Sequence, residues 1–220
     1  MSQEGVFPAY SQVHEIINNG DTECKNWNFD LASSLVCETI YNSIVRDLGV
    51  KKTSSDIIDI EVCYVKLNES VSEKGNVHKY ANMCAHYHPA SSRNPKVFRV
   101  NRDLSARKDK YHDVNLLADG NGDVNILMNS QEISRYFKLQ RYKDYDYSQY
   151  IGIPIICDST NQGKMVGLLE IVCHGDSIIS NEKEKILQYV NCFFAPYAQL
   201  LLLLFKLEKA LKAIPKNKKG

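Results

Sequence analysis

The closing third of the chain places the strongest constraint on the fold. It begins with two apolar runs, YIGIPIICD at 150–158 and MVGLLEIVCH at 165–174, separated by the polar turn STNQGK. Both runs are apolar at successive residues rather than at alternate ones. The sequence therefore predicts a hairpin of two strands in a sheet that is covered on both faces.

A long helix is predicted after this hairpin, over about residues 182–213. At 1.5 Å per residue it would be roughly 48 Å long, which exceeds the width of a small domain. Pro196 lies inside the helix and is expected to kink it. We therefore expect its C-terminal part to protrude and to meet a second copy of the chain. The predicted dimerisation residues are Leu200, Leu201, Leu204, Leu207 and Leu211.

Residues 186–205 of this helix carry no charge, and their number is sufficient for a membrane span. Polar residues and a proline interrupt them, however, at Gln188, Asn191, Pro196 and Gln199. A helix that is apolar nearly all round is also typical of a buried or dimer-forming helix. We therefore regard a membrane location as the weaker interpretation.

Composition and cysteine usage indicate a cytoplasmic globular protein. The 220 residues are 44% hydrophobic and 24% charged, and the seven cysteines form no CxxC pair. The first residues, MSQEGVFPAYSQ, lack the basic and then apolar pattern of a secretory signal. Reduced thiols in the cytoplasm are the expected state. The net charge of +1 gives no electrostatic reason to expect a nucleic-acid partner.

The first half predicts a helix followed by a second hairpin. Asp30 can cap a helix with apolar residues from Leu31 to Leu48, and Gly49 can end it. Residues 57–67 and 77–88 then predict two antiparallel strands. Residues 89–113 are irregular, and a loop of this length is typical of a lid over a site. A short helix is predicted over 130–139, with Ser130 as a cap.

The second strand of that first hairpin contains YANMCAHYHP, in which Cys84, His86 and His88 occupy alternate positions. Strand alternation predicts that they share one face with Tyr80, while the face with Ala81 packs against helices. Three interpretations stay open for this polar face. The residues can bind zinc, iron or copper, line a pocket for an organic ligand, or be satisfied by hydrogen bonds to loops. Tyrosines that follow the middle segment are further candidates to line such a pocket, at Tyr136, Tyr147 and Tyr150.

The order of these elements resembles that of a GAF domain. The resemblance is carried mainly by residues 150–204, where Pro154 lies in the first strand and Gly167 and Leu168 in the second. It implies an α+β fold with a six-stranded antiparallel sheet. The N- and C-terminal helices would cover one face, and loops with short helices would roof the other. The implied division is an arm at 1–29, the GAF-like domain at 30–213 and a basic tail at 214–220.

GAF domains bind small molecules under the roof and pass the signal to partners through their terminal helices, usually as dimers. The resemblance thus implies a non-catalytic sensory or regulatory module, a homodimer that acts on a separate output protein. Neither the NKFDE residues of cyclic-nucleotide-binding members nor the bilin-attaching cysteine context of phytochromes is recognisable, so the ligand and any cofactor are unknown. The expected ligand-binding residues are Cys84, His86, His88, Tyr80, Tyr136, Tyr147 and Tyr150, with no catalytic residue and no assigned metal ligand.

Two alternatives belong to other functional classes. Free methionine sulfoxide reductases are thiol enzymes with a GAF fold, and Cys84 could act as a nucleophile if His86 or His88 lowered its pKa. The second alternative is a protein-interaction module that dimerises and binds no ligand.

Overall fold

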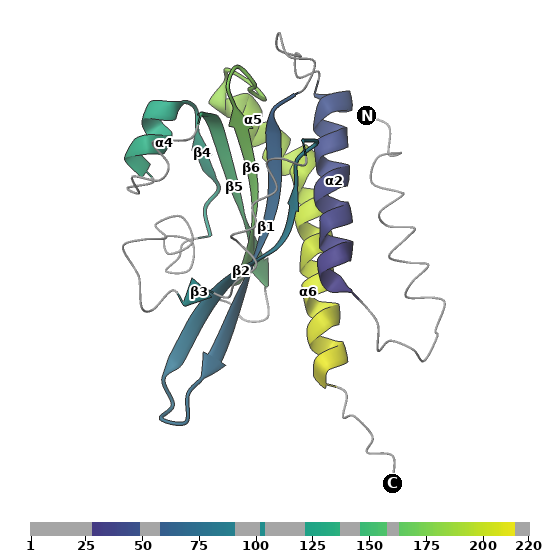
Figure 1. Ribbon diagram of the computed structural model, residues 1–220, viewed down its shortest axis with the longest axis vertical. Coiled ribbons are helices and arrows are strands. Elements are labelled where there is room, and N and C mark those ends of the chain that lie inside the picture. The colour runs from purple at the N-terminus through teal and green to yellow at the C-terminus, as the bar shows by residue number, and fades with distance from the viewer. Residues whose placement is uncertain are drawn as a thin grey trace, which may run out of the picture.

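The computed structural model describes residues 28–48, 58–90, 102–103, 122–136, 146–157 and 163–213. Within these ranges six antiparallel strands form one sheet, in the order β3-β2-β1-β6-β5-β4 (Figure 1). The predicted α+β architecture is confirmed. The strands are β1 (Ile60–Val71), β2 (Val77–Tyr87), β3 (Arg102–Asp103), β4 (Asn125–Leu127), β5 (Tyr147–Cys157) and β6 (Lys164–His174).

Both predicted hairpins are present, and they lie side by side at the centre of the sheet. β1 pairs with β2 and β5 pairs with β6, while β1 and β6 join the two hairpins. The β1–β2 turn contains Gly75 at φ +79°, a conformation that favours glycine. Successive residues of the central strands are buried on both faces, as for Leu168 and Leu169 of β6, and this explains why their sequences are apolar at successive residues.

One face of the sheet is covered by α2 (Phe29–Asp47) and α6 (Ala195–Ala213), which run next to each other (Figure 1). We call it the helix face. Ile40 and Ile44 of α2 are fully buried against it. A buried hydrogen bond of 2.9 Å between Ser43 Oγ and Tyr197 OH joins the two helices. The N- and C-terminal helices thus pack on one face, as the sequence predicted.

The start of α2 differs from the prediction. Asn28 Oδ1 accepts a hydrogen bond of 3.1 Å from the Leu31 amide, so Asn28 is the cap and Asp30 lies in the first turn. The side chains of Leu31 and Leu35 are 58% and 39% exposed. The first two turns of the helix therefore expose an apolar surface. Gly49, the predicted end signal, lies outside the described residues.

The long closing helix is confirmed over residues 183–213. It consists of α5 (Lys183–Tyr189), a π-helical segment η5 (Val190–Phe194) and α6. The Ala195 amide donates to the Val190 carbonyl, five residues back. The proline that follows, Pro196, has no amide hydrogen to donate and would crowd the carbonyl four residues back. The wider π turn therefore lies next to Pro196, where the sequence predicted a kink.

The predicted protrusion of the leucine run is wrong. Leu200, Leu201 and Leu204 are between 0% and 2% exposed because α6 packs along the sheet and α2, so these three cannot contact a second chain. Leu207 and Leu211 are half-buried. Only the last turns of α6 extend past α2 (Figure 1). The helix 183–213 is long and apolar enough to cross a membrane, but half of its apolar window is buried inside the fold, as in a core helix.

The opposite face of the sheet, which we call the second face, is partly covered by α4 (Ser130–Tyr136). Ile133 of α4 packs with Leu127 of β4 and Tyr150 of β5. The cap is Asn129 rather than Ser130, because Asn129 Oδ1 accepts from the Glu132 amide at 2.9 Å. Most of the predicted roof lies outside the described residues, which omit 91–101, 104–121 and 137–145.

Candidate functional site

A β-bulge decides which residues of β2 reach the second face. Tyr64 pairs with Ala85 and Val65 pairs with Met83, so Cys84 is an extra residue on β2. The alternation reverses at this point. Cys84 therefore lies with Ala85 on the helix face, while Met83 packs in an apolar cluster on the second face. Our prediction that Cys84 and His86 share one face is wrong, and so is the placement of the Ala81 face of this strand against the helices, because Ala81 packs in the same cluster as Met83.

Polar residues form one continuous line across the second face, which we call the polar row. In the strand register His86 is opposite Cys63, Cys63 is opposite Glu170, and Glu170 is opposite Gly152. Gly152 is opposite Asn125 on β4. Directly paired residues on a sheet face have Cβ atoms about 5 Å apart, so neighbours in the polar row can interact.

Two of the predicted tyrosines extend the polar row. Tyr150 OH donates to Glu170 Oε1 at 2.8 Å, and Asn125 Nδ2 donates to Tyr136 OH. Gly152 makes the first contact possible, because a Cβ at this position would lie 2.8 Å from the Tyr150 hydroxyl oxygen. The glycine leaves space for the tyrosine ring to lie over it and reach Glu170.

A carboxylate between two histidines lies beside the polar row. Glu61 Oε2 is 3.3 Å from His86 Nε2, and Glu61 Oε1 is 3.1 Å from His174 Nε2. Burial alone would raise the pKa of Glu61, but its contacts with His174 and His86 outweigh burial and lower the pKa to about 2. The ring of Tyr147, another predicted residue, packs against His174 with centroids 4.9 Å apart.

Apolar clusters border the polar row on both sides. One is built around Val65, Ala81 and Leu168, with Leu67, Met83 and Met165 packed against them. The other consists of Leu127, Ile133 and Tyr150, with Tyr136, Tyr147 and Val172 packed against them. A line of hydrogen-bonding groups between two apolar surfaces is the usual composition of a small-molecule site.

Two other predicted residues do not join the polar row. His88 Nδ1 accepts from the Ala90 amide at 3.0 Å and His88 Nε2 lies 2.8 Å from Asp59 Oδ1, which fixes the end of β2. Its side chain is only 1% exposed. Tyr80 pairs with Asp103 of β3, and it alternates with Ala81, so it belongs to the helix face.

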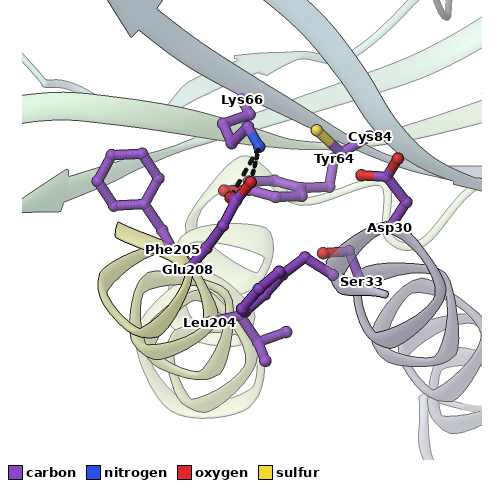
Figure 2. Close-up of a pocket in the computed structure, with 9 residues that line it drawn as sticks. Asp30, Ser33, Tyr64, Lys66, Cys84, Leu204, Phe205 and Glu208 are labelled. Carbon is purple, nitrogen blue, oxygen red and sulfur yellow. Dashed lines mark hydrogen bonds and ion pairs between the residues drawn. The ribbon is translucent and has the colours of Figure 1, made fainter. Parts of the chain in front are cut away.

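Cys84 instead lines a small recess between the sheet and the two helices (Figure 2). The recess has room for about one water molecule, too little for an organic ligand. Burial raises the pKa of the Cys84 thiol to about 11, so the thiol is protonated at neutral pH. The geometry does not support Cys84 as a nucleophile activated by His86, which lies on the other face. The other residues that line the recess are Phe29, Asp30, Ser33, Tyr64, Lys66, Leu204, Phe205 and Glu208.

The sequence reasoning overlooked five residues of this region. They are Glu61, Cys63, Asn125, Glu170 and His174. A signal was available for Glu170, since a single charge inside the apolar run MVGLLEIVCH requires a partner or a function. Glu61 and Cys63 lie two residues apart in the run IIDIEVCYVKL, so strand alternation could have placed them together.

Comparisons with known proteins identify the fold. No family model matches the chain, and no curated protein matches its sequence. Among solved structures, the GAF domain of a phosphoenolpyruvate-protein phosphotransferase from Acinetobacter is 14% identical, with a TM-score of 0.51 over 94% of this chain and 97% of that one. The equivalent domain from Coxiella burnetii is also 14% identical, with a TM-score of 0.50 over 97% of this chain and all of the other. The chain thus has a GAF-like fold.

Proposed function

We propose that this chain is a regulatory module that binds a small molecule on the second face and acts on a separate protein. The observation that carries the proposal is the polar row, which lies between two apolar clusters on the face opposite the terminal helices. The exposed fraction of Glu170 is only 8%. Burying a carboxylate is costly, so such groups concentrate at sites with a function.

The chemistry of the face selects a class of ligand. Glu61 and Glu170 are hydrogen-bond acceptors with negative charge, and the apolar clusters on either side suit a hydrocarbon body. The expected ligand is therefore a small molecule that carries amine, amide or hydroxyl donors on an apolar frame. The proposed location is the cytoplasm, and no nucleic-acid partner is proposed.

Mass spectrometry of the denatured protein tests the ligand proposal. The purified protein should release a small molecule that Glu170→Gln retains at a tenth of the level or less. Glu184→Gln is the matched control, because Glu184 is exposed on α5, and this variant should retain the molecule. If the parent protein releases nothing and no donor-bearing compound raises its melting temperature, the chain is an interaction module without a ligand.

The proposal includes a homodimer formed through the outward surfaces of α2 and α6. The support is the exposure of large apolar side chains there, 58% for Leu31, 39% for Leu35 and 43% for Leu203. These residues replace the buried Leu200, Leu201 and Leu204 as the expected contacts, and the half-buried Leu207 and Leu211 remain candidates.

Light scattering after size exclusion tests the dimer. Leu203→Lys should convert the dimer to a monomer, whereas Leu187→Lys should leave it intact, since Leu187 is 45% exposed on α5 rather than on α6. A parent protein that is monomeric at high concentration would contradict this part of the proposal.

A further inference from the structure

We infer that Glu61, Cys63 and His86 bind a divalent transition-metal ion, for which Zn²⁺ is the best match. The ligand-forming oxygen, sulfur and nitrogen atoms of these three residues all lie within 4.8 Å of one another. The inference goes beyond the proposed function, because it requires neither an organic ligand nor a partner protein.

The strand register explains why the three side chains converge. Cys63 on β1 is directly opposite His86 on β2, and Glu61 precedes Cys63 by two residues, so it points to the same face. In a tetrahedral zinc site with bonds of about 2.0–2.3 Å, ligand atoms are about 3.3–3.8 Å apart. Glu61 Oε2 and His86 Nε2 already meet this spacing at 3.3 Å. The remaining contacts, which are at most 4.8 Å, need to shorten by about 1.5 Å at most, which side-chain rotations can supply.

The donor set selects the class of metal. Thiolate sulfur, imidazole nitrogen and carboxylate oxygen together suit Zn²⁺ and its neighbours among the first-row metals. Calcium and magnesium prefer sites made of oxygen alone. Three protein ligands leave a fourth position for water or for a ligand, as in open zinc sites.

His174 supplies an independent observation at the same place. Its side chain is 1% exposed, and its Nε2 lies 3.1 Å from Glu61 Oε1. Among the residues that the structure describes, no hydrogen-bond partner is present for His174 Nδ1. Buried polar atoms without a partner are exceptional, so this histidine requires an explanation. A histidine beside a metal-bound carboxylate would fix the orientation of that carboxylate, and we assign this positioning role to His174.

The two carboxylates make a cation favourable at this site. Glu61 belongs to the proposed ligand set, and Glu170 is the register partner of Cys63 on β6. Metal binding requires the Cys63 thiol to ionise, so one proton is released to solvent when the sulfur–metal bond forms. The nearby negative charges offset the double positive charge of the ion.

The test uses the full chain, freed of metal with a chelator and titrated with Zn²⁺ by calorimetry and with Co²⁺ by absorption spectroscopy. We expect about one equivalent of either metal to bind. Bound Co²⁺ should show the charge-transfer band of a thiolate ligand. Cys63→Ser should abolish the band and weaken Zn²⁺ binding by at least 100-fold. His174→Gln should retain the band and weaken binding by about 10- to 100-fold, the usual effect of losing a group that orients a ligand.

Cys192→Ser is the control for non-specific thiol binding, because Cys192 is exposed on η5, and it should bind both metals as the parent does. If Cys63→Ser fails to fold, as judged by circular dichroism, His86→Gln takes its place and should weaken Zn²⁺ binding to the same degree. The inference is overturned if the parent binds Zn²⁺ no more tightly than Cys63→Ser or His86→Gln, or if the Co²⁺ spectrum contains no thiolate band. Release of a small molecule from the metal-free parent would still support the proposed function in that case.

Discussion

Replacing Glu208 with leucine should destabilise the protein by about 3 kcal/mol, because the substitution leaves the Lys66 ammonium buried without its anion. Lys66 Nζ lies 3.0 Å and 2.8 Å from the two Glu208 oxygens (Figure 2). The side chains are 11% and 12% exposed. At 2.8 Å and an effective dielectric constant of about 20, the gross attraction is about 6 kcal/mol, which desolvation largely offsets. Breaking a buried pair from one side costs about 3–5 kcal/mol, and the residual exposure favours the lower value.

The reverse substitution should cost less. In Lys66→Met the Glu208 carboxylate keeps a second partner, since Lys212 Nζ lies 2.6 Å from Glu208 Oε1. We expect a loss of about 1–2 kcal/mol. The double variant Lys66→Met/Glu208→Leu should lie within about 1 kcal/mol of the parent, because apolar side chains of similar size can replace a buried pair. The three variants thus form a double-mutant cycle with a coupling energy of about 3–5 kcal/mol.

Urea denaturation at pH 7, followed by circular dichroism, measures all four free energies of unfolding. Lys164→Met is the control, because Lys164 and Glu69 form an exposed ion pair that should contribute less than about 1 kcal/mol. The reasoning is refuted if Glu208→Leu is as stable as the double variant, since the cost would then not arise from an uncompensated Lys66 charge.

Two further predictions concern acid stability and a close contact in the sheet. Burial alone would raise the pKa of Glu208, but hydrogen bonds from Lys212 and Lys66 lower it below the ordinary value of 4.5. The carboxylate therefore stabilises the fold above pH 4.5 and loses this effect as the pH falls below it. Acidification should thus lower the free energy of unfolding of the parent more than that of Lys66→Met/Glu208→Leu. Parallel curves of unfolding free energy against pH would contradict this. Gly167→Ala should lower the free energy of unfolding by about 1–3 kcal/mol, because its Cβ would lie 2.8 Å from the Tyr64 ring and 2.9 Å from the Val65 carbonyl oxygen. An unchanged midpoint of urea denaturation would contradict this prediction.

The hairpins and the closing helix could be predicted because their signals are local. Apolar periodicity and turn residues are properties of neighbouring positions, and they fix the type of each element. The face of Cys84 could not be predicted in this way. A single bulge residue reverses every later position in the strand, and nothing in YANMCAHYHP marks where the extra residue lies.

The burial of the leucines and the composition of the site could not be predicted, because both depend on contacts between segments that are far apart in the sequence. A helix that is apolar nearly all round does not indicate which side packs, so the burial of Leu200 and Leu201 depends on α2 and the sheet. The polar row depends on the pairing of β1 with β6, two strands separated by about a hundred residues. Glu170 and His86 could be combined into one site only once that register was known.

The π-helical segment sets the rotational phase of α6. A π turn accommodates one residue more than the α-helical spacing, and each residue of an α-helix advances the direction of the next side chain by about 100°. If the same residues formed regular α-helix instead, everything after η5 would be rotated by about that angle. Leu202 and Phe205 would then take the outward directions of Leu203 and Lys206, and Gln199 would turn inward in place of Leu200. The π-helical geometry of this short segment is therefore as strongly determined by the fold as the identity of the leucines that it orients.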